Sequence, residues 1–356
     1  MRLRPIRWMR RNLFGSPFDA ALTLLILWGL WYALWPLAEW ALIDAHWRGQ
    51  GREACAGGGA CWIFVKARLG QFLYGFYPAA ERWRVDLGIA LVVFATAPLF
   101  APGVRRRGSI ACIALPAAFA VAGLLFTGGL FGLVPVETGR WGGLMLTVIV
   151  AVTGIAASFP LGILLALGRR SEMPVIRTLS VVFIEFWRGV PLVTVLFMAS
   201  VMLPLFLPDG VNVDKLLRAL IGIALFAAAY MAEVVRGGLQ AIPRGQYEAA
   251  SALGLGYWRT LGLVVLPQAL RHVIPGIVGS FIALFKDTTL VLVIGLFDFL
   301  GIVQAALTDP QWLGFALEGY VFAAAVYWAF CFGMSRLSAR IEGRGAPANA
   351  PAGRTW

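Results

Sequence analysis

The chain alternates long apolar stretches with short polar ones, and many of the apolar stretches are long enough to cross a bilayer as helices. The clearest of them, residues 141–167, contains no charged residue. These stretches do not alternate apolar and polar positions residue by residue, so strands of a membrane barrel are not expected. We predict an all-α integral membrane protein with about eight transmembrane helices. The predicted spans are 20–38, 87–101, 110–126, 141–167, 190–207, 216–235, 273–297 and 319–335.

Basic residues gather at the ends of these spans. Five arginines precede the first span, so the positive-inside rule places the N-terminus in the cytoplasm. With eight spans the C-terminus is cytoplasmic too. Glu39-Trp40 follows the first span where a signal peptide would have small residues, which predicts an uncleaved anchor. Residues 172–188 are more amphipathic and are expected to lie along the inner membrane surface.

The pattern divides the chain near residue 137. Residues 1–137 are expected to form an N-terminal extension with three transmembrane helices and a periplasmic loop at about 40–86. Residues 138–341 are expected to form a five-helix core with a cytoplasmic loop at 237–270. The basic, Gly/Pro/Ala-rich residues 342–356 are expected to form a mobile cytoplasmic tail.

Composition supports a membrane protein, because 60% of the residues are hydrophobic and only 13% are charged. The net charge of +12 is spread over short segments at the ends of the apolar stretches. This distribution favours a role in setting the membrane topology, with contact to membrane lipid, over binding of nucleic acid. No lysine follows a glycine, so the phosphate-binding loop of P-loop ATPases is missing. The two histidines form no HExxH motif, and GxSxG is missing too. No catalytic residue and no metal ligand is predicted.

Two of the four cysteines, Cys55 and Cys61, flank AGGGA in the predicted periplasmic loop. An oxidising compartment allows a disulfide between them, whereas a pair of free thiols is the alternative.

A mildly polar stretch, residues 246–267, lies between apolar spans on the predicted cytoplasmic face. Pro243 suits the first turn of a short helix, which Gly254 can end in a left-handed cap. A second short helix from about Tyr257 is expected to end before Pro267, because proline disfavours helix in the residue before it. The alternative is an ordinary loop between two membrane helices.

Charged residues inside one apolar span form the second candidate site. Lys286 or Asp287 at mid-membrane costs roughly 2.5–3.5 kcal/mol each, so both are expected to face the bundle interior or water. Adjacent helical residues point apart, so each needs its own partner. Glu233 could pair with Lys286, and Arg188 or Arg236 could pair with Asp287. The functional interpretation is a polar passage for a charged solute, and the alternative is a structural ion pair or a broken helix.

Tyr230 and Glu233 lie one turn apart on another span, although Glu233 and Arg236 at i+3 could form only a local pair. The candidate passage residues are Tyr230, Glu233, Lys286, Asp287, Thr288 and Thr289.

Several motifs resemble a known family. Glu248-Ala249-Ala250, then Gly254 and Leu266-Pro267, have the spacing of the EAA loop of ABC-importer permeases. IEFWRGVPL, YMAEVVRGGLQAIPRGQYEAASALGLG, LPQALRHVIPG and FIALFKDTTLV resemble the polar amino-acid branch of that family, the histidine/glutamine/general L-amino-acid permeases. GACWIFVKARLGQFLYGFYP and ERWRVDL in the extension look like the second permease subunit of the general L-amino-acid importer.

This resemblance implies a permease subunit of an ATP-driven, binding-protein-dependent importer that moves L-amino acids from periplasm to cytoplasm across the bacterial inner membrane. It implies a heterodimer with a second permease subunit, two cytoplasmic ABC ATPase subunits that bind the ATP and Mg, and a periplasmic amino-acid-binding protein. No cofactor is expected in this chain.

The resemblance also assigns an ATPase-coupling role to part of the polar stretch. The implied coupling residues are Glu248, Ala249, Ala250, Gly254, Leu255 and Gly256. One departure is Gly279-Ser280, where many relatives carry Asn-Gln. The alternative function is a secondary amino-acid transporter or channel that uses Lys286 and Asp287 for ion coupling, and a second alternative is a membrane scaffold without a transport role.

Overall fold

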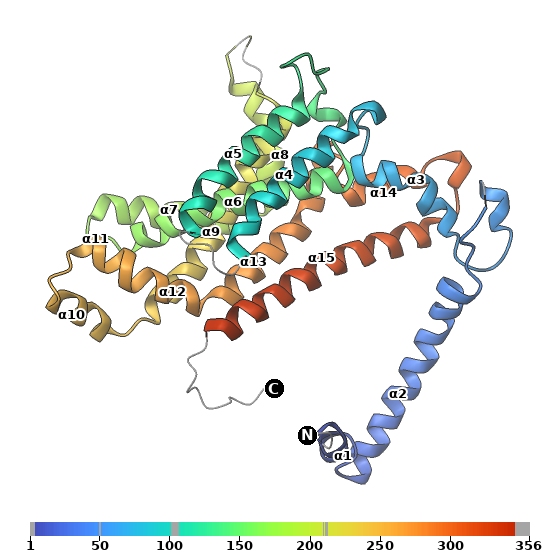
Figure 1. Cartoon of the computed structure of the whole chain (residues 1–356), viewed down its shortest axis with the longest axis horizontal. Coiled ribbons are helices and arrows are strands. Elements are labelled where there is room, and N and C mark those ends of the chain that lie inside the picture. Colours follow the sequence, from blue (N-terminus) through green and yellow to red (C-terminus); the bar gives the residue numbers. More distant parts are fainter. Residues whose placement is uncertain (1–3, 50, 101–106, 209, 211–212, 346–356) are drawn as a thin grey trace. The chain divides into compact units, whose positions relative to one another are not determined.

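The computed structural model describes residues 4–49, 51–100, 107–208, 210 and 213–345, and its regular structure is helical (Figure 1). The described residues contain isolated β-bridges but no strand, which confirms the all-α prediction. The chain forms two compact units, one of Met1–Leu69 with Ala306–Phe322 and one of Gly70–Ala305 with Ala323–Trp356. The predicted division at residue 137 rests on sequence motifs, whereas these two units are defined by their compactness. The division therefore stays a prediction.

The α-helices of the described chain are α1 (Arg4–Asn12), α2 (Pro17–Ala38), α3 (Trp62–Tyr74), α4 (Arg82–Phe100), α5 (Arg107–Thr127), α6 (Gly143–Arg169), α7 (Pro174–Gly189), α8 (Leu192–Phe197), α9 (Lys215–Gln240), α10 (Arg244–Ala252), α11 (Tyr257–Arg259), α12 (Leu266–His272), α13 (Ile274–Asp287), α14 (Phe299–Leu307) and α15 (Ala316–Gly345). The π-type segments are η1 (Glu39–Ile43), η5 (Met198–Met202) and η7 (Thr260–Val265). The 3-10 segments are η2 (Arg52–Cys55), η3 (Ala79–Glu81), η4 (Thr138–Arg140), η6 (Leu203–Phe206), η8 (Thr288–Ile294) and η9 (Pro310–Trp312).

Each of the eight predicted spans coincides with a helical segment. By length and apolar composition, however, only five described segments could cross a membrane, or six if the bent pair of α7 with α8–η6 is one span. The five are Pro17–Ile43, Gly143–Arg169, Lys215–Gln240, Ile274–Ile294 and Ala316–Glu342. The expected spans at α4 and α5 fall short of this test, since α4 begins with charged residues and the described apolar part of α5 is short. Arg105 and Arg106, Asp209, and residues 346–356 of the predicted tail lie outside the described residues.

The amphipathic segment predicted before the fifth span is a separate helix. Helix α7 begins with Pro174 in its first turn and makes an angle of 100° with α8–η6. The break falls at Val190, whose backbone is extended because Pro191 follows it. An amphipathic helix bent away from the next span is consistent with the predicted position along the membrane surface.

Small residues let the central helices of the larger unit approach closely. A Cβ at Gly162 of α6 would lie 2.6 Å from Cγ of Met231 on α9, and one at Gly154 would lie 3.0 Å from a methyl of Leu284 on α13. Such contacts are typical of membrane helix packing, in which small residues replace the hydrophobic effect as the determinant of close approach. Helices α6, α9 and α13 therefore form the centre of this unit.

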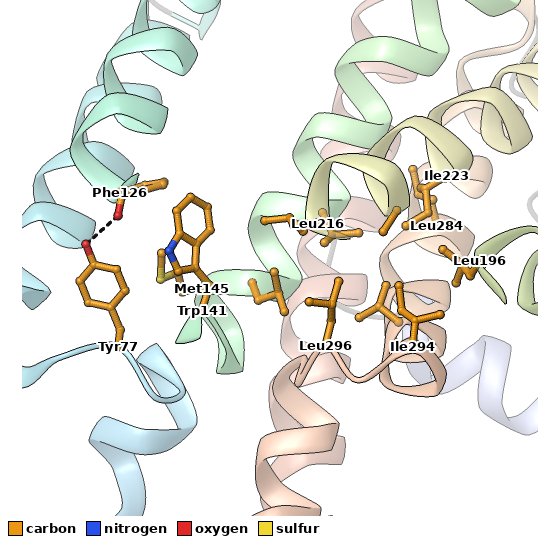
Figure 2. Packing of buried hydrophobic residues seen from close by; sticks show 14 of the residues in the cluster. Tyr77, Phe126, Trp141, Met145, Leu196, Leu216, Ile223, Leu284, Ile294 and Leu296 are labelled. Carbon is orange, nitrogen blue, oxygen red and sulfur yellow. Dashed lines mark hydrogen bonds between the residues drawn. The ribbon is translucent and has the colours of Figure 1, made fainter. Parts of the chain in front are cut away.

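Buried apolar side chains extend this centre to the helices before α6 (Figure 2). Trp141, just before α6, meets the ring of Phe126 edge to face, with ring centroids 5.7 Å apart. The buried Tyr77 hydroxyl donates a hydrogen bond of 2.9 Å to the Phe126 carbonyl. Helices α4 and α5, which pack side by side, are thus joined to the core that carries the candidate site.

A buried arginine satisfies part of the backbone where α8 becomes irregular. The guanidinium of Arg218 on α9 donates hydrogen bonds to the carbonyls of Ala199 and Ser200 in the π-type segment η5. A charged side chain in a membrane bundle is stable only when it finds such partners. The arrangement anchors the irregular segment to α9.

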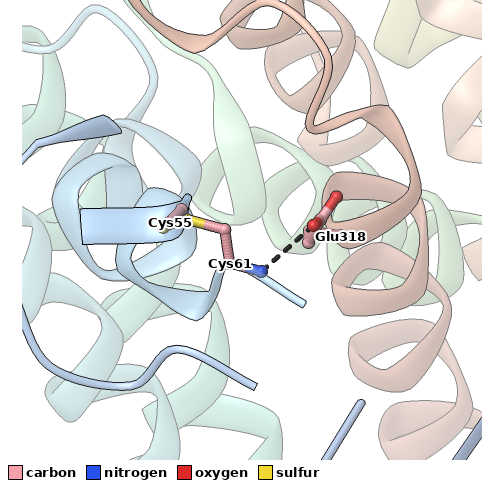
Figure 3. Close-up of a disulfide and its surroundings, with 3 residues drawn as sticks. All are labelled: Cys55, Cys61 and Glu318. Carbon is pink, nitrogen blue, oxygen red and sulfur yellow. Dashed lines mark hydrogen bonds between the residues drawn. A yellow bond between two sulfur atoms is a disulfide. The ribbon is translucent and has the colours of Figure 1, made fainter. Parts of the chain in front are cut away.

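The predicted periplasmic loop is largely structured, since it contains the helix α3. The structure joins Cys55 and Cys61 in a disulfide, and the backbone N–H of Cys61 donates a 3.0 Å hydrogen bond to the Glu318 carboxylate (Figure 3). Arg68 forms an ion pair with Asp309. The loop is therefore held both by its own bridge and by polar contacts to the chain around α15.

Helix α2 contributes a largely lipid-compatible surface. Its N-terminus is capped by Ser16, whose hydroxyl accepts the N–H of Asp19, and none of its residues is buried. Trp31 stacks on Trp35 with centroids 4.8 Å apart. An apolar helix with no burial in its own chain suits contact with lipid.

Candidate functional site

The α10 loop, defined here as residues 244–258, includes a backbone motif that needs glycine at the end of α10. Gly254 has φ +71°, its N–H bonds the Ser251 carbonyl at 2.9 Å, and the Leu255 N–H bonds the Ala250 carbonyl at 3.1 Å. This pair of bonds is a Schellman motif with glycine at the left-handed position. The predicted glycine cap is confirmed.

The outer surface of the α10 loop carries large apolar side chains. Leu253, Tyr257 and Trp258 are 80%, 64% and 76% exposed, and the two rings meet edge to face at 5.2 Å. Ala250 faces inward and is buried, whereas Glu248 is exposed. Contiguous exposed apolar side chains with polar neighbours are typical of a protein interaction site.

The expected helix end before Pro267 is wrong, because α11, η7 and α12 follow one another without a break. In η7 the N–H groups bond carbonyls five residues back, as Leu266 does to Leu261. This wider turn accommodates the proline ring that an ordinary helix interior would exclude. Gln268 then donates hydrogen bonds to the Val264 carbonyl at 2.8 Å and to the Gln246 side chain at 3.0 Å.

Contacts of the α10 loop also reach α6 and α9. Arg170, which follows α6, donates a 3.0 Å hydrogen bond to the Leu239 carbonyl of α9 and a 3.3 Å bond to the Tyr247 hydroxyl of α10. Together with the pair of Gln246 and Gln268, these bonds tie α10 to three neighbouring helices. A displacement of α10 would therefore pull on all of them.

Glu233 lies at the centre of a cluster of arginines. Its carboxylate is 2.9 Å from Nη1 of Arg169, 2.8 Å from Nη2 of Arg236 and 3.8 Å from Nη1 of Arg188. Arg169 also contacts Glu185 at 2.8 Å. The cluster joins α6, α7 and α9 through charge-assisted hydrogen bonds, which are stronger than neutral ones.

The partners predicted for the charges of the FKDTT segment are wrong. Glu233 pairs with the arginines and not with Lys286, although its predicted i+3 pair with Arg236 is confirmed. In the described chain, Lys286 and Asp287 have no ion pair within 4 Å. Arg169 was missed because the sequence marks it only as a basic residue at a span end.

Helix α13 stops at Asp287, and a 3-10 segment, η8, continues the span. The Thr288 hydroxyl donates to the Phe285 carbonyl at 2.8 Å, and the Thr289 hydroxyl donates to the Lys286 carbonyl at 3.0 Å. These bonds satisfy carbonyls at the change of helix type. The threonines thus stabilise the break, and Thr288 is buried.

A cavity of about 230 Å³ lies between α6, α9 and α13. Tyr230 and Asp287 are in its lining, whereas the other predicted passage residues are not. Sequence reasoning missed the lining residues Ser158, Phe226 and Ser280 because they carry no charge. The helical spacing of Phe226 with Tyr230, and of Ser280 with Asp287, could have indicated them.

Asp298, at the start of α14, is a third acid and is fully buried. Its carboxylate accepts hydrogen bonds from the N–H of Gly301 at 3.0 Å and from the Tyr327 hydroxyl at 3.1 Å. The Phe299 N–H bonds the Thr147 hydroxyl at 2.9 Å. Burial raises the pKa of Asp298, and the hydrogen bonds from Gly301 and Tyr327 partly oppose that rise.

Comparison with known proteins identifies the family of this chain. The family model of binding-protein-dependent transport system inner membrane components matches residues 158–344. The chain belongs to this family. The match includes α9, the α10 loop, all residues of the Glu233 cluster and all residues that line the cavity. This inner membrane component therefore carries its candidate site within the family region.

Two curated relatives are similar to this inner membrane component over nearly its whole length. One is the inner membrane amino-acid ABC transporter permease protein YhdY of Escherichia coli K12, 56% identical over 342 residues, covering 96% of this chain and 93% of the relative. The other is the glutamate/glutamine/aspartate/asparagine transport system permease protein BztC of Rhodobacter capsulatus, 40% identical over 403 residues, covering 95% and 93%. The N-terminal extension is thus included in both similarities.

A solved structure, described as the crystal structure of an amino acid ABC transporter with histidines, is similar to part of this component. It has a TM-score of 0.51 and 28% sequence identity, and the match covers 57% of this chain and 92% of the other.

Proposed function

We propose that this chain is one of two permease subunits of an ATP-driven, binding-protein-dependent importer of L-amino acids. Family membership supports the transport role, and the names of both curated relatives support amino acids as the cargo. The proposed partners are a second permease subunit, two cytoplasmic ATPase subunits that bind ATP and Mg, and a periplasmic amino-acid-binding protein.

The observation that carries this proposal is the exposed α10 loop. Its helix ends in a hydrogen-bonded glycine cap, and Leu253, Tyr257 and Trp258 project from the loop with most of their surface exposed. Aromatic side chains on a rigid support are typical anchors of protein interfaces. The proposed occupant of this surface is a groove of the ATPase, so the loop lies in the cytoplasm, as do both termini of the chain.

The contacts of α10 suggest how movement passes to the membrane helices. The bonds of Arg170 to α9 and α10, and of Gln246 to Gln268, join the loop to the helices around the cavity. In the proposed cycle, closure of the ATPase dimer moves α10, and the helices around the cavity alternate between inward-open and outward-open arrangements. The cavity with Tyr230 and Asp287 belongs to the proposed passage, together with the neighbouring Glu233 and residues 286–289.

The decisive experiment is purification of the tagged chain from its native membrane, followed by identification of the proteins that accompany it. A P-loop ATPase and a second permease are expected, and the complex in proteoliposomes with the binding protein is expected to take up amino acids on addition of ATP. Uptake that needs an ion gradient instead of ATP would favour the secondary transporter and contradict this proposal.

Gly254 tests the coupling role of the loop. A valine at φ +71° is strained by about 1–2 kcal/mol, although nothing lies within 4 Å of the position its Cβ would take. Gly254→Val is therefore expected to distort the loop and uncouple ATP hydrolysis from uptake. The matched variant is Gly254→Asn, because asparagine tolerates the left-handed conformation.

Uptake per ATP hydrolysed, measured in proteoliposomes, is expected to fall severalfold in the valine variant and to recover in the asparagine variant. Equal losses in both variants would indicate that the ATPase surface excludes any side chain at this position. Normal coupling of ATP hydrolysis to uptake in the valine variant would contradict the proposed coupling role of the loop.

A further inference from the structure

Asp287 occupies an unusual position in the cavity between α6, α9 and α13. The lining is mostly apolar, with Phe226 and Tyr230 on α9 and Phe281 and Leu284 on α13. Of the described residues in the lining, Asp287 alone carries a formal charge at neutral pH. The cavity thus presents one carboxylate in apolar surroundings.

No group of the described chain neutralises this carboxylate by direct contact. Among the described residues, none donates a hydrogen bond to the Asp287 carboxylate, and no cation lies within 4 Å of it. The adjacent Lys286 is exposed, and its side chain points away from that of Asp287 because neighbouring helical residues lie on different faces. The hydroxyls of Ser158 and Ser280 donate to backbone carbonyls of their own helices, so they are also unavailable to it.

An acid in a membrane bundle is costly, and such acids normally find a partner or serve a ligand. The three arginines of the Glu233 cluster are paired with Glu233, and none of them forms an ion pair with Asp287. A cationic group entering the cavity would therefore meet a carboxylate whose hydrogen-bonding capacity is unused. The volume of about 230 Å³ is below the roughly 300–1,000 Å³ typical of drug-sized ligands, which favours a small solute.

We propose that Asp287 binds the α-ammonium group of the transported amino acid in this cavity. This inference rests on the proposed function and adds the recognition chemistry of the substrate. The ammonium group donates hydrogen bonds to the Asp287 carboxylate, and the apolar walls from α9 and α13 contact the rest of the solute. Because every α-amino acid carries this ammonium group, the contact selects the substrate class rather than one side chain.

The second charge of an amino acid also finds a complement nearby. The Arg188 guanidinium lies over the ring of Tyr230, 5.8 Å from its centroid, and Tyr230 lines the cavity. Of the three arginines, Arg188 lies farthest from the Glu233 carboxylate, and the Arg188 side chain is 37% exposed. A cation beside the aromatic wall favours a substrate that carries a carboxylate as well as an ammonium group.

The test measures binding to the purified complex of both permeases and the ATPases, with the binding protein left out so that it contributes no site. The probes are L-glutamine, L-glutamate and L-leucine, each paired with its analogue that lacks the α-amino group: glutaramate, glutarate and 4-methylpentanoate. In the wild-type complex, at least one amino acid is expected to bind about tenfold or more tightly than its analogue, the effect of a charge-assisted hydrogen bond.

Asp287→Asn is expected to raise the Kd of that amino acid about tenfold or more and to leave the Kd of its analogue unchanged. Asp287→Glu, which keeps a carboxylate, is expected to retain part of the preference. Glu172→Gln removes an acid on the exposed connection between α6 and α7 and serves as the matched control, with both constants unchanged. A thermal unfolding curve of each variant checks that it is folded.

An unchanged preference in Asp287→Asn would overturn this proposal, as would a wild-type complex that binds no amino acid or makes no distinction between the paired probes. ATP-driven uptake of amino acids by the wild-type complex is measured separately. Its success together with an unchanged preference in Asp287→Asn would reject the role of Asp287 alone, whereas its failure would reject the proposed function.

Discussion

Glu233 and Asp287 are both acids on core helices of the larger unit, but their surroundings differ. Glu233 contacts three arginines from three helices, and all its contacts are ion pairs within 4 Å. Asp287 is at the end of α13, lines a cavity, and has no such contact within the described chain. The first acid holds helices together, and the second leaves its carboxylate free.

The difference separates structural from ligand-binding chemistry among residues of one type. A half-buried acid that is saturated with arginines gains little from a ligand, because a ligand would have to displace strong hydrogen bonds. A partly buried carboxylate whose oxygens accept no hydrogen bond destabilises the fold until a cation binds it. Asp298 is an intermediate case, because backbone N–H groups and a tyrosine hydroxyl satisfy it without a cation.

The largest effect is expected for Glu233→Gln. The substitution leaves three arginines close together without their shared counter-charge, and breaking buried pairs costs about 3–5 kcal/mol. The Glu233 side chain is 17% exposed, so we expect a value near the low end, about 3 kcal/mol. The loss is measured as a fall in Tm of the purified complex.

The double variant Glu233→Gln with Arg236→Gln provides the control for this prediction. Removing one arginine lowers the repulsion among the remaining two, so the double variant is expected to be more stable than Glu233→Gln alone. Equal Tm values for the single and double variants would mean that the cluster does not couple these residues.

A smaller effect, visible only as a dependence on pH, is expected from Asp298. Burial raises the pKa of this acid above its ordinary value of 3.8, so the folded chain binds the proton more tightly than the unfolded chain. The stability that the proton contributes is complete below about pH 3.8 and is lost as the pH rises through the raised pKa.

Asp298→Asn removes this titration and keeps an oxygen acceptor for the N–H of Gly301. The Tm of the wild-type complex minus that of the variant is therefore expected to fall from pH 4 towards pH 7. Thermal unfolding at three pH values in this range measures the trend, and a difference that rises with pH would show that the carboxylate is stabilised in its charged form.

The sequence was sufficient for features determined by neighbouring residues. Gly254 was predicted to end a short helix, and its left-handed backbone confirms this. The amphipathic pattern of α7 likewise predicted a helix apart from the next span. These features depend on backbone conformation and on spacing within one segment, both of which are visible in the sequence.

Features that depend on contacts between segments could be predicted less well from the sequence. Periodicity places Glu233 on a helix face but does not show that Arg169 of α6 lies opposite it, which is why the predicted pair with Lys286 is wrong. The helix continued through Pro267 because η7 widens the turn, which the rule for residues before proline does not anticipate. The cavity was only partly predicted, since charge drew attention to Asp287 but not to Phe226.

The smallest effect on stability is expected for Asp287→Asn, the counterpart of the change at Glu233. The Asp287 carboxylate makes no hydrogen bond or ion pair with the described fold, so its replacement by an amide of similar size removes none. We expect the free energy of unfolding to fall by no more than about 0.5 kcal/mol, because the amide loses no partner and carries no charge to bury. The measurement is the Tm of the purified complex without amino acid, compared directly with Glu233→Gln. A loss as large as that of Glu233→Gln would show that Asp287 has a structural partner, and the distinction between the two acids would then fail.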